Sequence, residues 1–361
     1  MSWAIWVTGR PGSGKSTLAR AAAARLAEHD EPVVLLELDQ VRRVLTPTPS
    51  YSDAEREIVY RALVFMAGAL TEAGVPVLID ATAHRRAWRE MARASIPRFA
   101  EVQIDCPLDV AQARERTRTV GHAPPAIYAG AGHPGATVPG VNVPYERAES
   151  PELVVDTSVE GTVAAAERVA TLARGLRPPL RRRSGDRGAV IWITGPPGSG
   201  KTTLASHLGE SLAAEGVTVK VLEWIALRAS VLGGRHPGEA GEDVTHRALA
   251  YTAKLLAESG VTVVVDATAP RRAWRALARD ICGSFAEVQL VCPPEICRDR
   301  ERAVRWGPRP GASAAGPDVV LEYEHSLRPD LVLDTAVRSE WAAAEDLLRL
   351  ARRLLRRRLA S

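Results

Sequence analysis

The chain has 361 residues, a formal net charge of +4 at pH 7, 46% hydrophobic residues and 25% charged residues. This length predicts two domains of ordinary size, each able to bury its own core, and the composition is that of a soluble globular protein. No run of about 18 apolar residues occurs, and the start has no basic segment with a cleavage site, which argues against a membrane span and against export. We therefore expect a cytoplasmic protein without a membrane partner.

The cysteines do not predict a metal site, and the arginine clusters do not predict nucleic-acid binding. The four cysteines lack the spacing of a zinc site. Cys106 and Cys292 follow apolar runs, and we expect buried thiols in a reducing compartment. The arginine clusters at 181–183 and 356–358 lie beside a boundary and a chain end, without interleaved aromatic residues. A solvated linker and a solvated helix end explain them, and we expect no nucleic-acid partner.

In the first half, short apolar runs alternate with helical stretches rich in Ala, Arg and Glu. This alternation predicts an α/β fold in which a parallel sheet carries helices on both faces. We expect strands at 3–8, 33–37, 75–80, 100–105 and 152–155. We expect helices at 15–29, 53–73, 85–95, 108–118 and 160–174.

A phosphate-binding loop lies between the first predicted strand and the first predicted helix. It fits the pattern Gly-x4-Gly-Lys-Ser/Thr in full, which in this context is typical of P-loop NTPases. The glycines let backbone N–H groups surround phosphates, and the helix adds its positive end. We expect Lys15 to reach the β- and γ-phosphates of ATP and Ser16 to bind Mg²⁺. The expected nucleotide-binding residues are Gly9, Gly12, Ser13, Gly14, Lys15, Ser16 and Thr17.

Acidic and basic side chains follow the second and third predicted strands. We expect Asp39 to hold the metal or orient an attacking hydroxyl, and Arg42 to hold an anionic substrate, with a surface salt bridge as the alternative. Asp80 ends an apolar strand, where a metal-directed carboxylate is common, and helix capping is its alternative. The catalytic candidates are Lys15, Asp39 and Asp80. Further substrate-binding candidates are Arg56 and Arg61, and also Arg85 and Arg86, for which a solvated helix surface is the alternative.

The phosphate-binding loop returns 186 residues later as part of a tandem repeat. We expect domains at 1–175 and 189–361, joined by a Pro/Arg-rich linker at 176–188. Later pairs such as Tyr145 and Tyr323 are 178 residues apart, so the second copy has lost eight residues from a Gly/Pro-rich loop. The expected nucleotide-binding residues of the second copy are Gly195, Gly198, Ser199, Gly200, Lys201, Thr203 and Thr202, the last also as a metal ligand.

On these residues the first copy resembles the adenylylsulfate (APS) kinase family from residue 3 to about 157. The resemblance is carried by the phosphate-binding loop, Glu37 to Arg42, Tyr51 to Arg56, Ala83 to Arg86, Pro107 to Arg114 and a lid-like stretch from Ile127 to Glu146. It implies transfer of the γ-phosphate of ATP to the 3′-hydroxyl of APS with Mg²⁺. It also implies that Arg42 and Arg56 hold the phosphosulfate and that Arg114 lies near the adenine of ATP. The lid from Tyr128 to Tyr145 is then expected to close over the substrates.

The second copy departs from this pattern. Ile225 stands where the first copy has Asp39, and Glu242 stands where it has Arg56. An isoleucine cannot bind a metal or accept a proton, and a glutamate is expected to repel an anionic acceptor. We therefore expect a catalytic first copy and a second copy that binds nucleotide but transfers phosphate poorly.

The first copy also departs from the family in places. Glu37 stands where the family usually has aspartate, and the lid carries no lysine. The acceptor stays open between APS and another small hydroxyl compound or a polynucleotide 5′ end. A nucleotide-sensing module without turnover is the non-enzyme alternative. The expected partners are small-molecule nucleotide substrates, and both a homodimer and a pairing of the two halves within one chain stay open.

Overall fold

The computed structural model divides the chain into two compact units, Met1–Ser184 and Gly185–Ser361. The structure describes residues 1–117, 127–132, 137–176, 187–234, 238–305 and 322–357. Nearly all of the linker predicted at 176–188, with its arginine cluster, lies outside these ranges, and so does much of the Gly/Pro-rich loop that differs between the copies. None of the helices in the described ranges combines the length and the apolar character that a membrane span requires.

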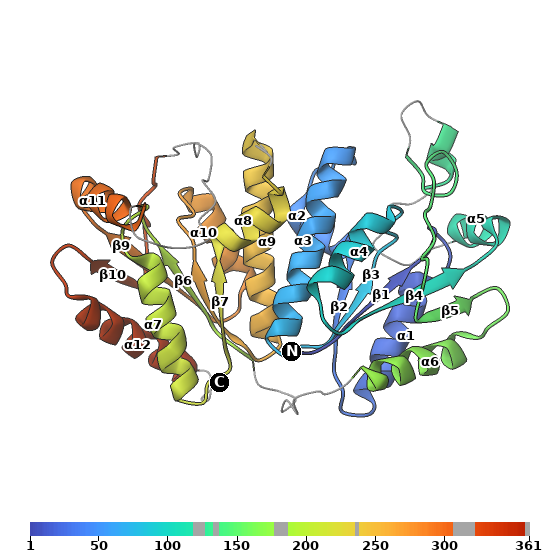
Figure 1. Cartoon of the computed structure of the whole chain (residues 1–361), viewed down its shortest axis with the longest axis horizontal. Helices are drawn as coiled ribbons and strands as arrows, with labels where there is room; N and C mark the ends of the chain where they lie inside the picture. The colour runs from blue at the N-terminus through green and yellow to red at the C-terminus, as the bar shows by residue number, and fades with distance from the viewer. Residues whose placement is uncertain (118–126, 133–136, 177–186, 235–237, 306–321, 358–361) are drawn as a thin grey trace. The chain divides into compact units, whose positions relative to one another are not determined.

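The first unit is built on a five-stranded parallel sheet with the order β2-β3-β1-β4-β5 (Figure 1). Its strands are β1 (Ala4–Thr8), β2 (Val34–Glu37), β3 (Val77–Asp80), β4 (Phe99–Asp105) and β5 (Leu153–Asp156). Its helices are α1 (Lys15–Ala27), α2 (Leu38–Leu45), α3 (Asp53–Glu72), α4 (Arg86–Ser95), α5 (Leu108–Arg116) and α6 (Thr162–Gly175), with a short 3-10 turn η1 (Ala129–Gly132).

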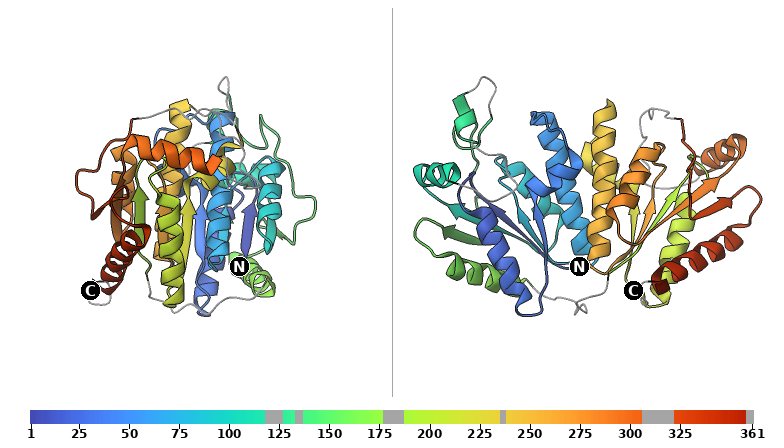
Figure 2. Two further views of the ribbon diagram at one scale, coloured as in Figure 1. Left: turned by 60° about the vertical axis from the view of Figure 1, so that its left-hand side comes forward. Right: turned by 180° about the vertical axis from the view of Figure 1, so that it is seen from behind.

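Helices cover both faces of this sheet, as Figure 2 shows from behind. Side chains alternate between the two faces of a strand, so Ile5 and Val7 pack in the core cluster beneath α1 and α6. Between them Trp6 points to the other face, where its ring stacks on Tyr60 of α3 with centroids 6.4 Å apart. The indole N–H of Trp6 donates to the carbonyl of Ala81, which satisfies a polar group inside the core.

The second unit repeats this architecture, with the order β7-β8-β6-β9-β10 read from the matching edge. Its strands are β6 (Val190–Thr194), β7 (Val219–Glu223), β8 (Thr262–Asp266), β9 (Phe285–Val291) and β10 (Leu331–Asp334). Its helices are α7 (Lys201–Ala214), α8 (Trp224–Leu232), α9 (Gly238–Glu258), α10 (Arg272–Ile281), α11 (Pro294–Arg305) and α12 (Glu340–Arg357).

The predicted α/β fold class is therefore confirmed in both units, and each strand and helix expected in the first unit lies within two residues of its prediction. One helix was missed: α2 follows β2 directly, and no helix was expected at 38–45. Because the strands are parallel, their carboxyl ends share one edge, where Glu37 lies level with Asp80 and Asp105 level with Asp156. This is the edge at which open α/β sheets bind ligands.

Candidate active site

The first phosphate-binding loop needs glycine for backbone geometry and for close packing. Gly12 and Gly14 have φ angles of 71° and 91°, in the region that side chains disfavour. A Cβ at Gly12 would also lie 2.2 Å from the carbonyl oxygen of Ala111 in α5. Gly14 is the N-cap of α1, so the free N–H groups of that helix point into the loop.

In the described chain, one serine hydroxyl of each phosphate-binding loop lacks a hydrogen-bond partner, which a phosphate could supply. The hydroxyl of Ser13 is buried and has no hydrogen-bond partner among the described residues. Lys15 is buried, and its ammonium donates to the backbone carbonyl of Arg10 at 2.8 Å. Ser199 in the second unit is orphaned in the same way, and Lys201 donates to the carbonyl of Pro196 at 2.9 Å. Both loops therefore fit a polyphosphate.

A buried carboxylate faces the hydroxyl that follows each of these lysines. Ser16 hydrogen-bonds to Asp80, and burial raises the pKa of that carboxyl, against the opposing effect of Lys15. In the second unit Thr202 donates to Asp266 at 2.6 Å, and burial raises the pKa of Asp266 as well. A hydroxyl and a carboxylate are oxygen ligands of the kind that Mg²⁺ takes, together with substrate phosphates.

The structure excludes the capping interpretation of Asp80. Helix α4 begins at Arg86 and has Arg85 as its N-cap, so the alternative that Asp80 caps this helix is wrong. Glu37 and Asp39 both act to raise the pKa of Asp80 electrostatically, so the three acids share one region. No group of three or more His, Cys, Asp and Glu side chains in the described parts of the chain could hold a metal by itself.

The candidate arginines gather on the β2–β3 side of the loop. Arg42, on α2, is buried and forms an ion pair of 3.0 Å with Glu55. Arg85 reaches Asp53 at 2.6 Å. Arg61 instead pairs with Glu57 on its own helix at 2.7 Å.

Arg56 differs from these arginines because its charge is only weakly compensated. Its side chain is 11% exposed, and the oxygen of Asp53 lies 3.8 Å from Nη1. Nη2 donates to Thr137 in the lid segment, whereas Nη1 is buried without a hydrogen-bond partner among the described residues. Burial and the neighbouring arginines Arg42 and Arg85 lower the pKa of Arg56. A buried guanidinium in this state has hydrogen-bonding capacity of the kind that anions use.

The described parts of the lid stretch contact the loop and the sheet. Tyr128 donates from its hydroxyl to the carbonyl of Pro11 at 2.8 Å, and burial raises its pKa to about 12. The hydroxyl of Tyr145 lies 2.9 Å from that of Thr8 and donates to Gln103 at 3.2 Å. Tyr323 contacts Thr194 in the same way at 3.2 Å. Each of these tyrosines thus fastens its segment to the end of the central strand of its unit.

Arg114 supports the phosphate-binding loop through a neighbour. It donates to the backbone carbonyl of Thr157 at 2.8 Å, and the hydroxyl of Thr157 donates to the carbonyl of Ser13 at 2.8 Å. Arg300 and Thr335 repeat the first contact at 2.7 Å in the second unit. The loop after the last strand is therefore tied to the phosphate-binding loop in both units.

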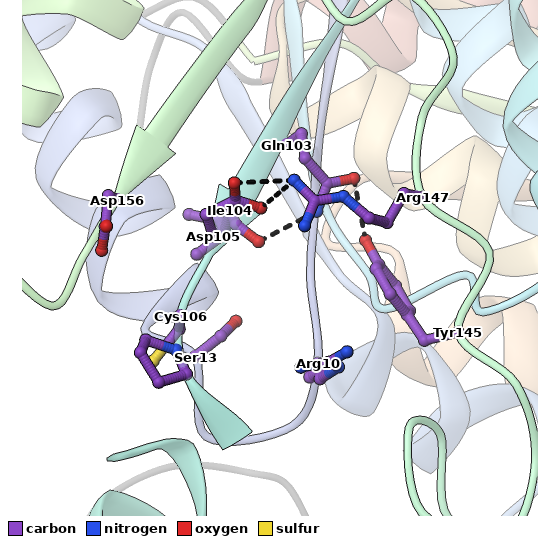
Figure 3. Close-up of a pocket in the computed structure, with 10 residues that line it drawn as sticks. Arg10, Ser13, Gln103, Ile104, Asp105, Cys106, Tyr145, Arg147 and Asp156 are labelled. Atoms are coloured by element: carbon purple, nitrogen blue, oxygen red, sulfur yellow. Dashed lines mark hydrogen bonds and ion pairs between the residues drawn. The ribbon is translucent and has the colours of Figure 1, made fainter. Parts of the chain in front are cut away.

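A pocket of about 310 Å³ lies beside the loop, between the ends of β4 and β5. Figure 3 shows Arg10, Tyr145 and Arg147 around it, with Arg147 bonded to Asp105. Cys106 lines this pocket and is partly exposed, as is Cys292, so the expectation that both are buried thiols was wrong. Sequence reasoning also missed Arg10, although its place inside the motif was visible.

The acceptor side of the second unit has changed in charge. Ile225 is 76% exposed where Asp39 stands in the first unit. Glu242 takes the position of Arg56 along the repeat, but it forms an ion pair of 3.0 Å with Arg228. Glu242 thus does for Arg228 what Glu55 does for Arg42. Glu242 therefore forms an ion pair where a free, repelling carboxylate was expected, and it supplies no positive charge at the position of Arg56.

In the second unit, three stacked rings lie one helical turn beyond Glu242. His246 is stacked between Trp224 and Trp274, with ring centroids 3.8 and 3.7 Å away. In the first unit Tyr60 occupies this place, stacked on Trp88 with centroids 4.0 Å apart. Burial lowers the pKa of His246 to about 3, so the ring is neutral near pH 7.

A family model and several curated relatives match this chain. The family model of adenylylsulphate kinase matches the chain twice, over residues 1–156 and 187–334. A probable adenylyl-sulfate kinase of Archaeoglobus fulgidus is 39% identical over 160 residues, which are 44% of this chain and 97% of that protein. One of Pyrococcus abyssi is 36% identical over 157 residues, 43% of this chain and 84% of that protein. A solved Mycobacterium tuberculosis APS kinase, in complex with AMPPNP and APS, is 28% identical with a TM-score of 0.39, over 46% of this chain and 99% of that one.

Proposed function

Since this chain belongs to the adenylylsulphate kinase family of ATP-dependent phosphotransferases that act on a hydroxyl group, we propose that its first unit transfers the γ-phosphate of ATP to the 3′-hydroxyl of APS. The observation that carries this proposal is the buried guanidinium of Arg56, whose Nη1 has no hydrogen-bond partner in the described chain. APS carries an anionic phosphosulfate, which is the kind of group that such a cation binds.

On the donor side, the loop holds the triphosphate by its backbone N–H groups, Ser13 and Lys15. Ser16 and Asp80 are the residues that would hold Mg²⁺, which when bound neutralises charge on the β- and γ-phosphates. Arg114 acts indirectly. It hydrogen-bonds to Thr157, and Thr157 in turn hydrogen-bonds to Ser13 of the loop.

On the acceptor side, Arg42, Arg56 and Arg85 hold the phosphosulfate while Tyr128 and Tyr145 belong to the cover. Asp39 orients the 3′-hydroxyl and takes its proton as the oxygen attacks the γ-phosphorus. The new O–P bond forms, the bond from the γ-phosphorus to the β,γ-bridging oxygen breaks, and ADP leaves. Catalysis then consists of positioning and charge neutralisation, without a covalent intermediate.

The second unit keeps the donor half of this arrangement and lacks the acceptor half. Lys201 and the pair Thr202–Asp266 support nucleotide binding. Ile225 offers no group to orient a hydroxyl, and Glu242 pairs with Arg228 instead of supplying a positive charge as Arg56 does. We therefore infer that the second unit binds nucleotide with little or no transfer to APS.

The test compares Lys15→Ala with Lys201→Ala in the full chain, measuring 3′-phospho-APS formed from ATP and APS. We expect Lys15→Ala to lose roughly 100-fold or more of the rate, and Lys201→Ala to keep most of it. Loss in Lys201→Ala with activity retained in Lys15→Ala would reverse the assignment of the two units. Faster ADP release by the unaltered chain with nucleosides, sugars or oligonucleotide 5′ ends than with APS would overturn the acceptor alone.

A further inference from the structure

Arg10 is a cation inside the first phosphate-binding loop that has no equivalent in the second. It is the second residue of the loop, and Pro196 holds that place in the repeat. The first unit contains one lysine, Lys15, so Arg10 is the other cationic side chain of this loop. The two loops otherwise share their glycine geometry, with φ angles of 71° at Gly12 and 73° at Gly198.

The stem of Arg10 packs on the lid segment at a point where a side chain is not tolerated. A Cβ at Gly140 would lie 2.9 Å from Nε and 3.0 Å from Cδ of Arg10, and Gly140 has a φ of 85°. The turn around Gly140 is held by bonds from its N–H to the carbonyl of Val143 and from the N–H of Val141 to the carbonyl of Val138. The lid segment therefore meets the loop at this side chain, in addition to the hydrogen bond from Tyr128 to Pro11.

The charge of Arg10 is not neutralised by the acids around it. Its Nε is buried without a hydrogen-bond partner among the described residues. Asp105, which lines the same pocket, is bonded through both oxygens to Arg147 at 2.6 and 2.7 Å. Asp156 accepts from the N–H and the hydroxyl of Ser158. Both pocket carboxylates thus have other partners, and Figure 3 shows Arg10 standing apart from that network.

We propose that Arg10 contacts the terminal phosphates of ATP and, through its stem on Gly140, holds the lid segment in register over them. The side chain starts inside the loop that holds the phosphates and has donor capacity that the described protein groups do not use. A guanidinium there adds positive charge where negative charge develops during transfer. The proposal rests on the first unit being the one that transfers phosphate. Arg10 would supply, from the loop, positive charge that the lid does not supply through lysine.

The test separates the charge of Arg10 from its stem. Arg10→Met keeps an unbranched stem against Gly140 and loses the charge, whereas Arg10→Lys keeps a charge. Both are made in a Lys201→Ala background, which removes the contribution of the second nucleotide site. Arg116→Met, at an exposed position on α5, is the matched control for loss of one positive charge. The measurements are the affinities for AMPPNP and for ADP by equilibrium titration, and kcat and KM for transfer.

For Arg10→Met we expect the AMPPNP affinity to fall about 10-fold or more, as for a lost hydrogen bond to a charged group, and the ADP affinity to fall less. We expect kcat to fall, Arg10→Lys to recover part of both losses, and Arg116→Met to match the parent. Equal affinities of Arg10→Met and the parent for AMPPNP would overturn the proposal, and so would equal losses for AMPPNP and ADP. Because AMPPNP binding needs no acceptor, this outcome is independent of whether APS is the substrate.

Discussion

The hydroxyl of Thr202 donates a hydrogen bond of 2.6 Å to the carboxylate of Asp266. Ser16 and Asp80 make the matching contact in the first unit. In both units burial raises the pKa of the acid, so the folded protein holds a charged carboxylate at a cost in stability. Such a cost is common where a charge serves a ligand rather than the fold.

Asp80→Asn is therefore expected to stabilise the first unit and to reduce its activity. A raised carboxyl pKa means that stability falls as pH rises through its titration range, so removing the charge adds stability at pH 7. We expect Tm without ligands to rise by about 2–4 °C and kcat to fall roughly 100-fold. Asp266→Asn is the matched variant, and it is expected to give a similar rise in Tm with transfer retained. A fall in Tm of Asp80→Asn would contradict the cost that we assign to its charge.

Arg56→Ala is expected to weaken the acceptor site without weakening the nucleotide site. Its guanidinium is buried and lies on the β2–β3 side of the loop. We expect KM for APS to rise about 10-fold or more, with little change in the affinity for AMPPNP. Arg43→Ala removes an exposed charge from α2 and serves as the control. Parallel losses of APS and AMPPNP binding in Arg56→Ala would show a general disturbance instead.

The second unit is expected to lose stability in mild acid because of His246. Its pKa is lowered to about 3, mainly by burial. The folded ring therefore stays neutral between about pH 6.5 and 3. In the unfolded chain the same ring takes up a proton over this range, which stabilises the unfolded state relative to the folded state. The unfolding free energy should hold above pH 6.5 and fall as pH decreases below it.

His246→Tyr removes this titration and restores the residue type that Tyr60 represents in the first unit. Thermal unfolding at pH 7 and at pH 4.5 checks the prediction. We expect the Tm difference between these two values to be smaller in His246→Tyr than in the parent. His84 of the first unit, with a pKa lowered to about 4 mainly by burial, and the carboxyls of Asp80 and Asp266 titrate in both proteins and contribute to the remaining dependence. An unchanged Tm difference would assign the acid sensitivity elsewhere.

Arg89 is expected to be among the most costly side chains to replace. It is buried, pairs with Glu101 at 2.5 Å, and donates to the backbone carbonyls of Ala83 and Glu146. Arg89→Met leaves the buried carboxylate of Glu101 without this partner, which costs on the order of 3–5 kcal/mol. Chemical denaturation measures the loss. The double variant Arg89→Met/Glu101→Leu should recover part of it, and a further loss in the double variant would refute this cause.

The sequence predicts the elements of this fold well because their signals are local. Buried parallel strands are continuous apolar runs, and the intervening helices are long. Helix α2 escaped because its eight residues follow β2 without a turn residue between them. The phosphate-binding loop is also a local pattern, because its glycines are required by the positive φ angles of the loop backbone.

The acceptor side could not be predicted to the same degree, because it depends on which distant side chains meet. The repeat alignment pairs Glu242 with Arg56 and suggests a simple reversal of charge. The structure shows instead that Glu242 serves Arg228, one helix position away from the place that Glu55 holds. Cys106 was misjudged for a related reason: the end of β4 opens onto a pocket whose other wall comes from residues about 40 positions later.

The ion pair of Arg228 and Glu242 also governs the order in which the second copy could regain its lost charge. Glu242→Arg alone would remove the counter-charge of Arg228 and bring two guanidinium groups together. Gly241→Glu first would place a carboxylate where Glu55 stands in the first copy, and Glu242→Arg could then follow. Gly241→Glu therefore has to precede Glu242→Arg if Arg228 is to keep a carboxylate partner at each step. The two copies thus differ at two neighbouring positions whose order of change matters, Gly241 against Glu55 and Glu242 against Arg56.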